Sequence, residues 1–289
     1  LPKFNFLVKK QVLVAAVAVA LVAFLFIAGK TSIGKKNTDT GAKKTKQTFN
    51  IQLVIKDLAA KLDPQKIEYL AKLENSVKRG DVKTQQIEAF EQLANFWKDS
   101  VSAFEPYAFY ISEAAQLDNS EKKLTFAAQL FLGRLRQEHD TEKLGWQTQQ
   151  AILLFNKALQ LNPANADLKI GLGSAYVFGS QSGDAQQTMQ GIQQLLSVVR
   201  EDSNNMKAQF VLGVGSAVSG QYNKAIERFT KVVTAEPTNV EAIAFLADTY
   251  AATGNKNEAV KWYNVSKKLV NNSSYSKEVD KRIELLNTR

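Results

Sequence analysis

The chain has 289 residues, of which 45% are hydrophobic and 22% charged, and it contains no cysteine and a single histidine, His139. The hydrophobic share is enough for a folded core, which excludes a chain that is disordered throughout. The lack of cysteine excludes disulfides and thiolate metal sites, and one histidine excludes a multi-histidine metal centre.

The net charge of +9 is concentrated near the N-terminus. Residues 1–48 carry nine lysines and one acid, Asp39, and so hold +8 of that charge, while the rest of the chain is nearly neutral. Nucleic-acid binding needs cations gathered on a folded surface, whereas these lysines flank a hydrophobic run. We therefore expect no nucleic-acid partner.

The hydrophobic run covers residues 12–29 and contains no charge. As a helix it would span roughly 27 Å, close to the hydrocarbon thickness of a bilayer. A cleaved signal peptide would have a shorter apolar run, and a buried core helix would show a polar stripe. We predict a single transmembrane helix at 12–29 after a short flank, 1–11. The lysines on the two sides leave its orientation open.

Residues 30–48 are small, polar and rich in lysine, with no apolar periodicity. This composition is typical of a flexible tether. Two roles remain open for its lysines: contact with anionic lipid headgroups, or keeping the linker soluble and extended.

Three markers recur together in the remaining sequence. The first is a leucine followed by a small residue: Leu132-Gly133, Leu172-Gly173, Leu212-Gly213 and Leu246-Ala247. The second is a small residue with a large one four positions later: Ala151/Phe155, Gly191/Leu195, Ala225/Phe229 and Ala259/Tyr263. The third ends each unit, at Pro163, Ser203, Pro237 and Asn271. Because the copies of all three markers follow one another at intervals of about 34–40 residues, the sequence predicts an internal repeat.

The markers fit antiparallel helix pairs. A small residue in the first helix allows the second helix to approach, and residues four apart on the second helix share one face. Gly220 and Gly254 fall between paired helices, where a tight turn favours positive φ. Thr238 and Glu241 have the spacing of a capping box.

This pattern resembles the tetratricopeptide (TPR) family, most clearly over residues 206–239 and 240–273. The resemblance implies an all-α TPR-type solenoid of antiparallel helix pairs, preceded here by the N-terminal transmembrane helix. We expect degenerate helix pairs at 49–119, the TPR array at 120–273 and a C-terminal capping helix at 274–289. Extra residues near 138–147 and 179–190 are expected to form insertion loops.

The resemblance also implies a partner-binding groove lined by the first helix of each pair. By family position its residues are Arg134, Ile170, Ser174, Val177, Phe178, Phe210, Val214, Val218, Glu241 and Asp248. The middle of this groove is apolar, which favours an amphipathic helix or an extended hydrophobic segment as the partner. The alternative to a bound partner is that residues 50–79 of the same chain occupy the groove.

The order of anchor, lysine-rich tether and repeats resembles bacterial membrane-anchored TPR proteins, including ancillary proteins of the Sec translocon. It implies a protein-binding scaffold in the inner (cytoplasmic) membrane that assists envelope protein biogenesis or secretion, with its repeats in the periplasm. Two alternatives remain: a cytoplasmic array, and a fixed structural subunit of a larger membrane complex.

No catalytic motif is complete in the sequence. Gly29-Lys30-Thr31 lacks the first glycine of a phosphate-binding loop, because that position is Phe24. We expect no enzymatic activity, no cofactor and no metal. A rival enzyme hypothesis would depend on Arg134, His139 and Asp140.

Overall fold

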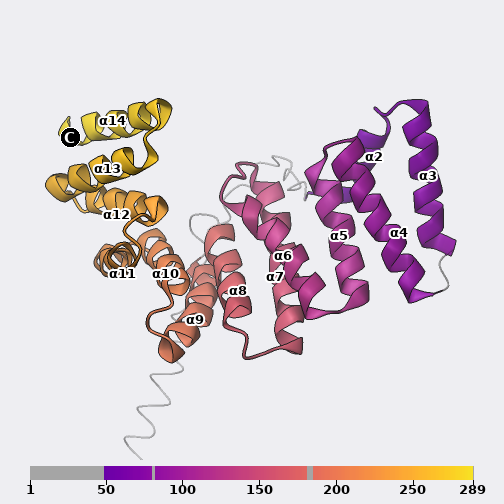
Figure 1. Ribbon diagram of the computed structural model, residues 1–289, viewed down its shortest axis with the longest axis horizontal. Coiled ribbons are helices and arrows are strands. Elements are labelled where there is room, and N and C mark those ends of the chain that lie inside the picture. Colours follow the sequence, from indigo (N-terminus) through magenta and orange to yellow (C-terminus); the bar gives the residue numbers. More distant parts are fainter. Residues whose placement is uncertain (1–48, 80–81, 181–184, 289) are drawn as a thin grey trace, which may run out of the picture. The chain divides into compact units, whose positions relative to one another are not determined.

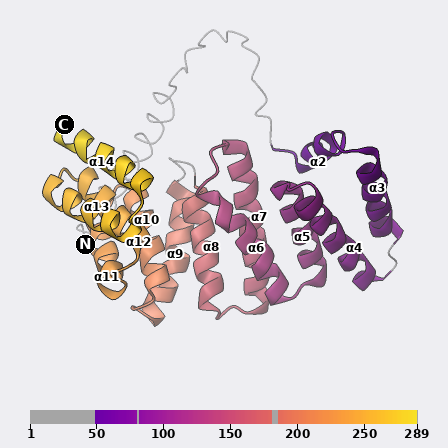
Figure 2. The ribbon, with the colours of Figure 1, turned by 45° about the horizontal axis from the view of Figure 1, so that its top comes forward.

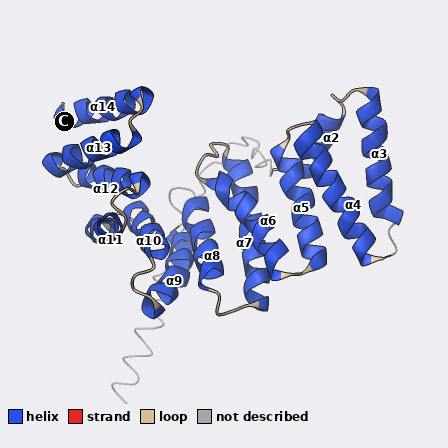
Figure 3. Ribbon diagram, in the orientation of Figure 1, coloured by secondary structure: helices blue, strands red, loops and turns tan. Residues whose placement is uncertain are grey.

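The computed structural model describes residues 49–79, 82–180 and 185–288. Every regular element in these ranges is helical (Figure 3), which confirms the all-α fold for the described part of the chain. The chain divides into two units, 1–47 and 48–289, and the helices described below belong to the second. The predicted anchor at 12–29 and tether at 30–48 lie outside the described residues. Within the described ranges, no helix combines the length and apolar character needed to cross a bilayer.

The helices follow one another in chain order (Figures 1 and 2). They are α2 (Ile51–Ala59), α3 (Pro64–Arg79), α4 (Lys83–Asn95), a π-helical turn η1 (Phe96–Ser100), α5 (Phe104–Asp118), α6 (Glu121–Leu135), α7 (Thr141–Leu161), α8 (Ala166–Gly179), α9 (Ala185–Glu201), α10 (Met206–Val218), α11 (Tyr222–Ala235), α12 (Val240–Ala252), α13 (Lys256–Val270) and α14 (Ser273–Asn287).

From α4 onward the helices pack as pairs. The most extensive contacts join α4 to α5, α6 to α7, α8 to α9, α10 to α11 and α12 to α13. The second helix of each pair also contacts the first helix of the next pair. In addition, the first helices α6, α8, α10 and α12 touch in succession. The result is a TPR-like helical solenoid in which each pair is covered by its neighbours.

Asparagine side chains begin the first helices of three successive pairs. Asn165, Asn205 and Asn239 precede α8, α10 and α12, and each accepts a hydrogen bond from the backbone N–H three residues later. They are spaced like the leucines of the first marker in the same helices, Leu172, Leu212 and Leu246. The predicted capping box at Thr238 is wrong, because the adjacent Asn239 caps α12 instead.

The close approach within pairs depends on small residues. A Cβ atom on Gly191 of α9 would lie 2.7 Å from the backbone oxygen of Gly173 in α8. A Cβ atom on Gly213 of α10 would lie 2.6 Å from the ring of Phe229 in α11. Because Phe229 is fully buried, these helices have no room for a larger residue at that contact.

Leu132-Gly133 does not occupy the place that the repeat pattern predicts for it. A Cβ atom on Gly133 would meet nothing within 4 Å, and Leu132 is only partly buried, whereas Leu172, Leu212 and Leu246 are in the core. The residues of α6 that are fully buried between helices are Leu124, Ala127, Ala128 and Phe131. The buried small residue of α6, Ala128, thus lies five residues before the predicted Gly133, which is more than one helical turn.

The two expected insertions explain part of this error. The sequence predicts a loop at 138–147, but α7 begins at Thr141 and runs for 21 residues. Asp140 caps α7 by accepting hydrogen bonds from the N–H groups of Glu142 and Lys143. The extra residues therefore lengthen α7 and do not form a loop. The interval of 40 residues from Leu132 to Leu172 does not mark equivalent positions in two repeats. In the second insertion, α9 is already helical from Ala185.

The turns inside two pairs have the expected glycines. Gly220 adopts φ +75° between α10 and α11, and Gly254 adopts φ +76° between α12 and α13. This confirms the turns predicted from the sequence, since positive φ is strained for residues with a side chain.

Gly191→Ala tests the close approach of α8 and α9. We expect this change to lower the free energy of unfolding by about 1–3 kcal/mol, because the new methyl group meets a backbone oxygen that cannot rotate away. The measurement is the urea midpoint followed by circular dichroism.

Gly133→Ala is the matched control. The exposed helical Gly133 has open space around it, so alanine should raise stability by about 0.5 kcal/mol through its higher helix propensity. Equal stability of Gly191→Ala and the parent chain would contradict the glycine-dependent packing.

Candidate binding cavity

A cavity of about 640 Å³ lies along the first helices α6, α8 and α10 and reaches the start of α12. Half of the residues predicted from the family position lie in its wall: Ile170, Ser174, Phe178, Phe210 and Glu241. They come from three different helix pairs. The stacking of the pairs therefore brings together side chains that are far apart in the sequence.

The other predicted residues have different surroundings. Val177 and Val214 are buried in the hydrophobic core, while Val218 is 54% exposed outside the cavity wall. Arg134 places its guanidinium 4.3 Å from the ring centroid of Phe104 in α5. The register of α6 accounts for this placement of Arg134.

In α6, Gln129 takes the cavity position that the sequence predicts for Arg134. Gln129 follows the buried Ala128 in the same way that Ser174 follows Gly173 on α8, and both line the cavity. Leu132 lines it as well. The register inferred from Leu132-Gly133 thus displaced the predicted position by more than one helical turn.

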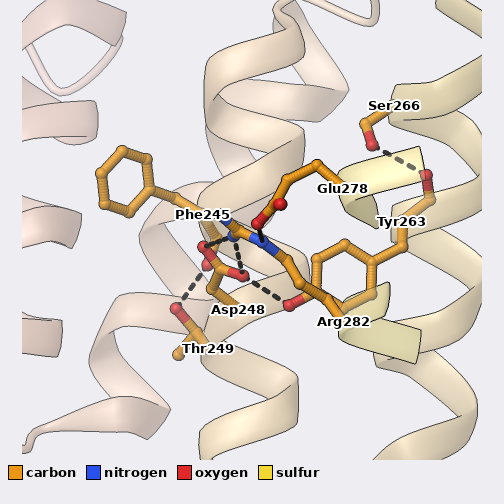
Figure 4. Close-up of polar contacts among 7 residues, drawn as sticks. All are labelled: Phe245, Asp248, Thr249, Tyr263, Ser266, Glu278 and Arg282. Carbon is orange, nitrogen blue, oxygen red and sulfur yellow. Dashed lines mark hydrogen bonds and ion pairs between the residues drawn. The ribbon is translucent and has the colours of Figure 1, made fainter. Parts of the chain in front are cut away.

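Asp248 is engaged in contacts within the chain (Figure 4). Its carboxylate accepts hydrogen bonds from Nη1 of Arg282 at 3.1 and 3.3 Å and from the hydroxyl of Tyr263. Burial, and then the Asp248 carboxylate, raise the pKa of Tyr263 above its ordinary value. Nε of Arg282 also donates to Glu278 at 3.3 Å. Asp248 therefore fastens α13 and α14 to α12.

Arg136, which the sequence analysis did not select, crosses the cavity. It follows the end of α6, and its guanidinium forms an ion pair with Glu241 in the first turn of α12. The guanidinium carbon also lies 5.2 Å from the ring centroid of Phe178 and 5.5 Å from that of Phe245. Burial lowers the pKa of Arg136, although a guanidinium remains protonated at physiological pH.

An aromatic cluster lies next to the cavity and contributes Phe210 to its wall. The ring of Phe210 lies 5.5 Å from that of Phe245 and 5.9 Å from that of Phe229. Phe245 is missing from the predicted set. The sequence nevertheless contains a signal for Phe245, because Phe245 follows Phe210 at an interval close to one repeat length.

Residues 50–79 do not fill this cavity. Their helices α2 and α3 pack against α5 and α4 around the fully buried Trp97, and none of their residues lines the cavity. Just before α2, the ring centroid of Phe49 lies 4.8 Å from that of Trp146, and the ring centroid of Trp146 lies 5.3 Å from that of Phe131. The alternative in which residues 50–79 occupy the groove is therefore not seen in this cavity.

The three residues on which the rival enzyme hypothesis depends do not form a common site. Arg134 lies over Phe104, Asp140 caps α7, and His139 is exposed beside it. Across the described ranges, no three His, Cys, Asp or Glu side chains are grouped so as to hold a metal ion.

Comparison with known proteins supports the repeat class. A family model described as tetratricopeptide repeat matches residues 219–277, which is about a fifth of the chain. Among curated proteins no match is found. The match covers α12 and α13 completely and all of α11 as well. The helix pair of α12 and α13, together with the preceding helix α11, thus matches the TPR family model.

Several solved structures are similar in fold. A structure of MamA protein has 17% identity and a TM-score of 0.45 and covers 63% of this chain and 91% of its own. YrrB, described as a TPR protein with an unusual peptide-binding site, has 20% identity and a TM-score of 0.44, with coverages of 70% and 98%. TTC0263, a thermophilic TPR protein in Thermus thermophilus, has 15% identity and a TM-score of 0.49, with coverages of 72% and 100%.

Asp248→Asn tests the role of Asp248 in docking α14. The change removes the charge that faces Arg282, and we expect a loss of about 1 kcal/mol, because both side chains are more than 40% exposed. Hydrogen exchange of the α14 amides should become faster, while the amides of α8 and α10 keep their protection.

Glu68→Gln is the control for this change. Its ion pair with Lys72 is about 70% exposed on both sides, so exchange in α14 should not change. Unchanged α14 exchange in Asp248→Asn would show that the network does not hold this helix.

Proposed function

We propose that this chain is a membrane-anchored scaffold that binds protein partners in the cavity along α6, α8, α10 and α12. The observation that carries this proposal is the cavity itself, whose wall combines apolar side chains with a few charged groups. Binding sites of this kind take their affinity from buried apolar area and their orientation from placed polar groups. Assistance in envelope protein biogenesis or secretion is the proposed biological role.

The chemistry of the cavity supports a hydrophobic or amphipathic segment as the partner. Ile170, Phe178 and Phe210 provide apolar contacts from two neighbouring first helices. Phe178 and Phe210 are only partly buried, so their rings are accessible to a ligand. An amphipathic helix or extended peptide could cover this surface and leave its polar side toward solvent.

The membrane part of the proposal rests on the sequence. Residues 12–29 have the length and composition of a single transmembrane helix. We place the anchor in the inner (cytoplasmic) membrane and the repeats in the periplasm by analogy with membrane-anchored TPR proteins. The cytoplasmic orientation is the alternative outcome of the topology experiment below.

Photocrosslinking from the cavity tests partner binding. With benzoylphenylalanine at Phe178 or Phe210, intact cells should yield crosslinks to other proteins, because both residues line the cavity. Products are identified by mass spectrometry after solubilisation. Without crosslinking, one complex of fixed stoichiometry after detergent extraction at high salt and sizing would instead support a structural subunit of a membrane complex.

Positions outside the cavity provide the control. Leu153 on α7 and Met189 on α9 are 40% and 51% exposed, and neither lines the cavity. The same probe at these positions should capture the partners about tenfold less efficiently. Equal capture at all four positions, or capture of this chain alone at 178 and 210, would contradict the proposed binding site.

Labelling of an introduced cysteine tests topology, since the chain has none of its own. Ser32→Cys, in the predicted tether, should react with a membrane-impermeant maleimide added to intact cells if the repeats are periplasmic. Reaction only after lysis would indicate the cytoplasmic orientation. Release of the protein from membranes by sodium carbonate would contradict a transmembrane anchor.

Ala128→Cys is the matched control for accessibility. Ala128 is fully buried between helices, so a thiol at this position should react only after denaturation.

A further inference from the structure

Arg136 occupies the cavity in the way that a bound cation would. Its guanidinium lies near two aromatic rings, at 5.2 Å from the centroid of Phe178 and 5.5 Å from that of Phe245. It also forms an ion pair with Glu241. Two aromatic rings and a carboxylate form a typical recognition site for a cation. We name the group formed by Phe178, Phe245 and Glu241 the arginine subsite.

The charge of the surrounding wall favours a cationic ligand. Apart from Arg136, the charged residues that line the cavity are three acids and one base: Asp167, Glu236, Glu241 and Lys207. The one base, Lys207, forms an ion pair with Asp167, with 3.6 Å between Nζ and Oδ1. The charged residues of the wall sum to −1 with Arg136 and to −2 without it, and Glu241 loses its partner if Arg136 leaves the cavity. A ligand that supplies a cation therefore restores the missing interaction.

The Arg136–Glu241 ion pair is weak enough to be exchanged. The two side chains are 39% and 46% exposed, and ion pairs with this access to water contribute little. Arg136 also belongs to the connection between α6 and α7, which continues to residue 140 without regular structure. Its side chain can therefore withdraw without disrupting a helix interior.

The geometry favours arginine over lysine in the ligand. A planar guanidinium stacks on aromatic rings and is more weakly hydrated than an ammonium group, so its transfer into an aromatic site costs less. Residues 1–48 contain nine lysines but no arginine. The predicted tether of this chain therefore lacks the side chain that the subsite is shaped to hold.

We propose that the arginine subsite recognises an arginine side chain of a partner protein, flanked by apolar residues, and that Arg136 fills this subsite as an internal competitor until the partner displaces it. This inference rests on the proposed function and specifies the chemistry of the partner. An apolar segment with an embedded arginine would place its neighbours against Ile170 and Phe210.

The test measures peptide binding to the full chain in detergent by fluorescence anisotropy. The probe is a fluorescein-labelled nonapeptide with one central arginine between leucines and alanines. Arg136→Gln removes the competitor and should tighten binding about tenfold, because the binding-competent state becomes the major one. Glu241→Gln breaks the same ion pair but removes the recognition carboxylate, and should weaken binding about tenfold.

The two variants control for each other. Both abolish the Arg136–Glu241 ion pair, so a purely structural effect would change peptide affinity in the same direction in both. Lys169→Gln breaks an ion pair with Glu201 outside the cavity wall and should leave the affinity unchanged. Circular dichroism melting of each variant reports whether it remains folded.

The peptide itself is varied in the same assay. Replacing its arginine with citrulline keeps the shape but removes the charge, and should abolish the gain seen with Arg136→Gln. Equal binding of the citrulline or lysine peptide would overturn the inference, as would no binding of the arginine peptide to Arg136→Gln at about 1 mM. A glutamate peptide that binds wild type and is lost in Arg136→Gln would also overturn it, because Arg136 would then be a carboxylate anchor.

Failure of the inference is distinguishable from failure of the proposed function. One outcome is that crosslinking from Phe178 and Phe210 captures partners while the peptide binds equally well with and without its arginine. In that case the scaffold function stands and the proposed arginine subsite is contradicted. If neither position captures a partner, the cavity is not the binding site.

Discussion

The distance between the two helices of each pair determines the rest of this structure. In α8 and α9 that distance is so short that Gly173 and Gly191 place backbone against backbone, with no space for a side chain between them. In α10 and α11, Gly213 instead accepts the ring of the fully buried Phe229. The contacts differ in detail, but each makes the pair a compact unit that has an apolar surface left for its neighbour.

This pairing is what creates the cavity. Within each pair, the second helix packs closely against one side of the first helix. The first helices of successive pairs, α6, α8, α10 and α12, then contact one another in chain order. Their exposed faces then combine, so that Phe178, Phe210 and Glu241 line one cavity although each belongs to a different pair. The asparagine caps fix where three of these helices begin, which sets the position of each cavity residue along its helix.

The fold was largely predictable from the sequence, because helix pairing is encoded locally by small residues, turn glycines and repeat spacing. The register of α6 was not, since Leu132-Gly133 imitates the marker while Ala127 and Ala128 are the small residues buried between helices. Alanine is too common a helix residue to be distinguished by pattern alone. The same register error selected Arg134 in place of Gln129.

Interactions between distant pairs were also beyond the reach of the sequence. Asp248 has the family position of a groove residue, but Arg282 of α14, in a helix beyond the repeats, approaches it and engages its carboxylate. Arg136 and Glu241 lie in distant parts of the sequence and meet only because the helix pairs between them stack. No periodicity predicts such a meeting, since it depends on how the pairs accumulate rotation along the stack.

That long-range ion pair has a mechanical consequence. In a solenoid, forces pass from one unit to the next, so small rotations at each interface add up to bending of the whole stack. Arg136 and Glu241 link non-adjacent units, but both side chains are exposed to water, so their ion pair adds only a small resistance to such bending. The stiffness of this part of the chain should accordingly change only slightly with ionic strength, because counterions screen a pair that is already weak.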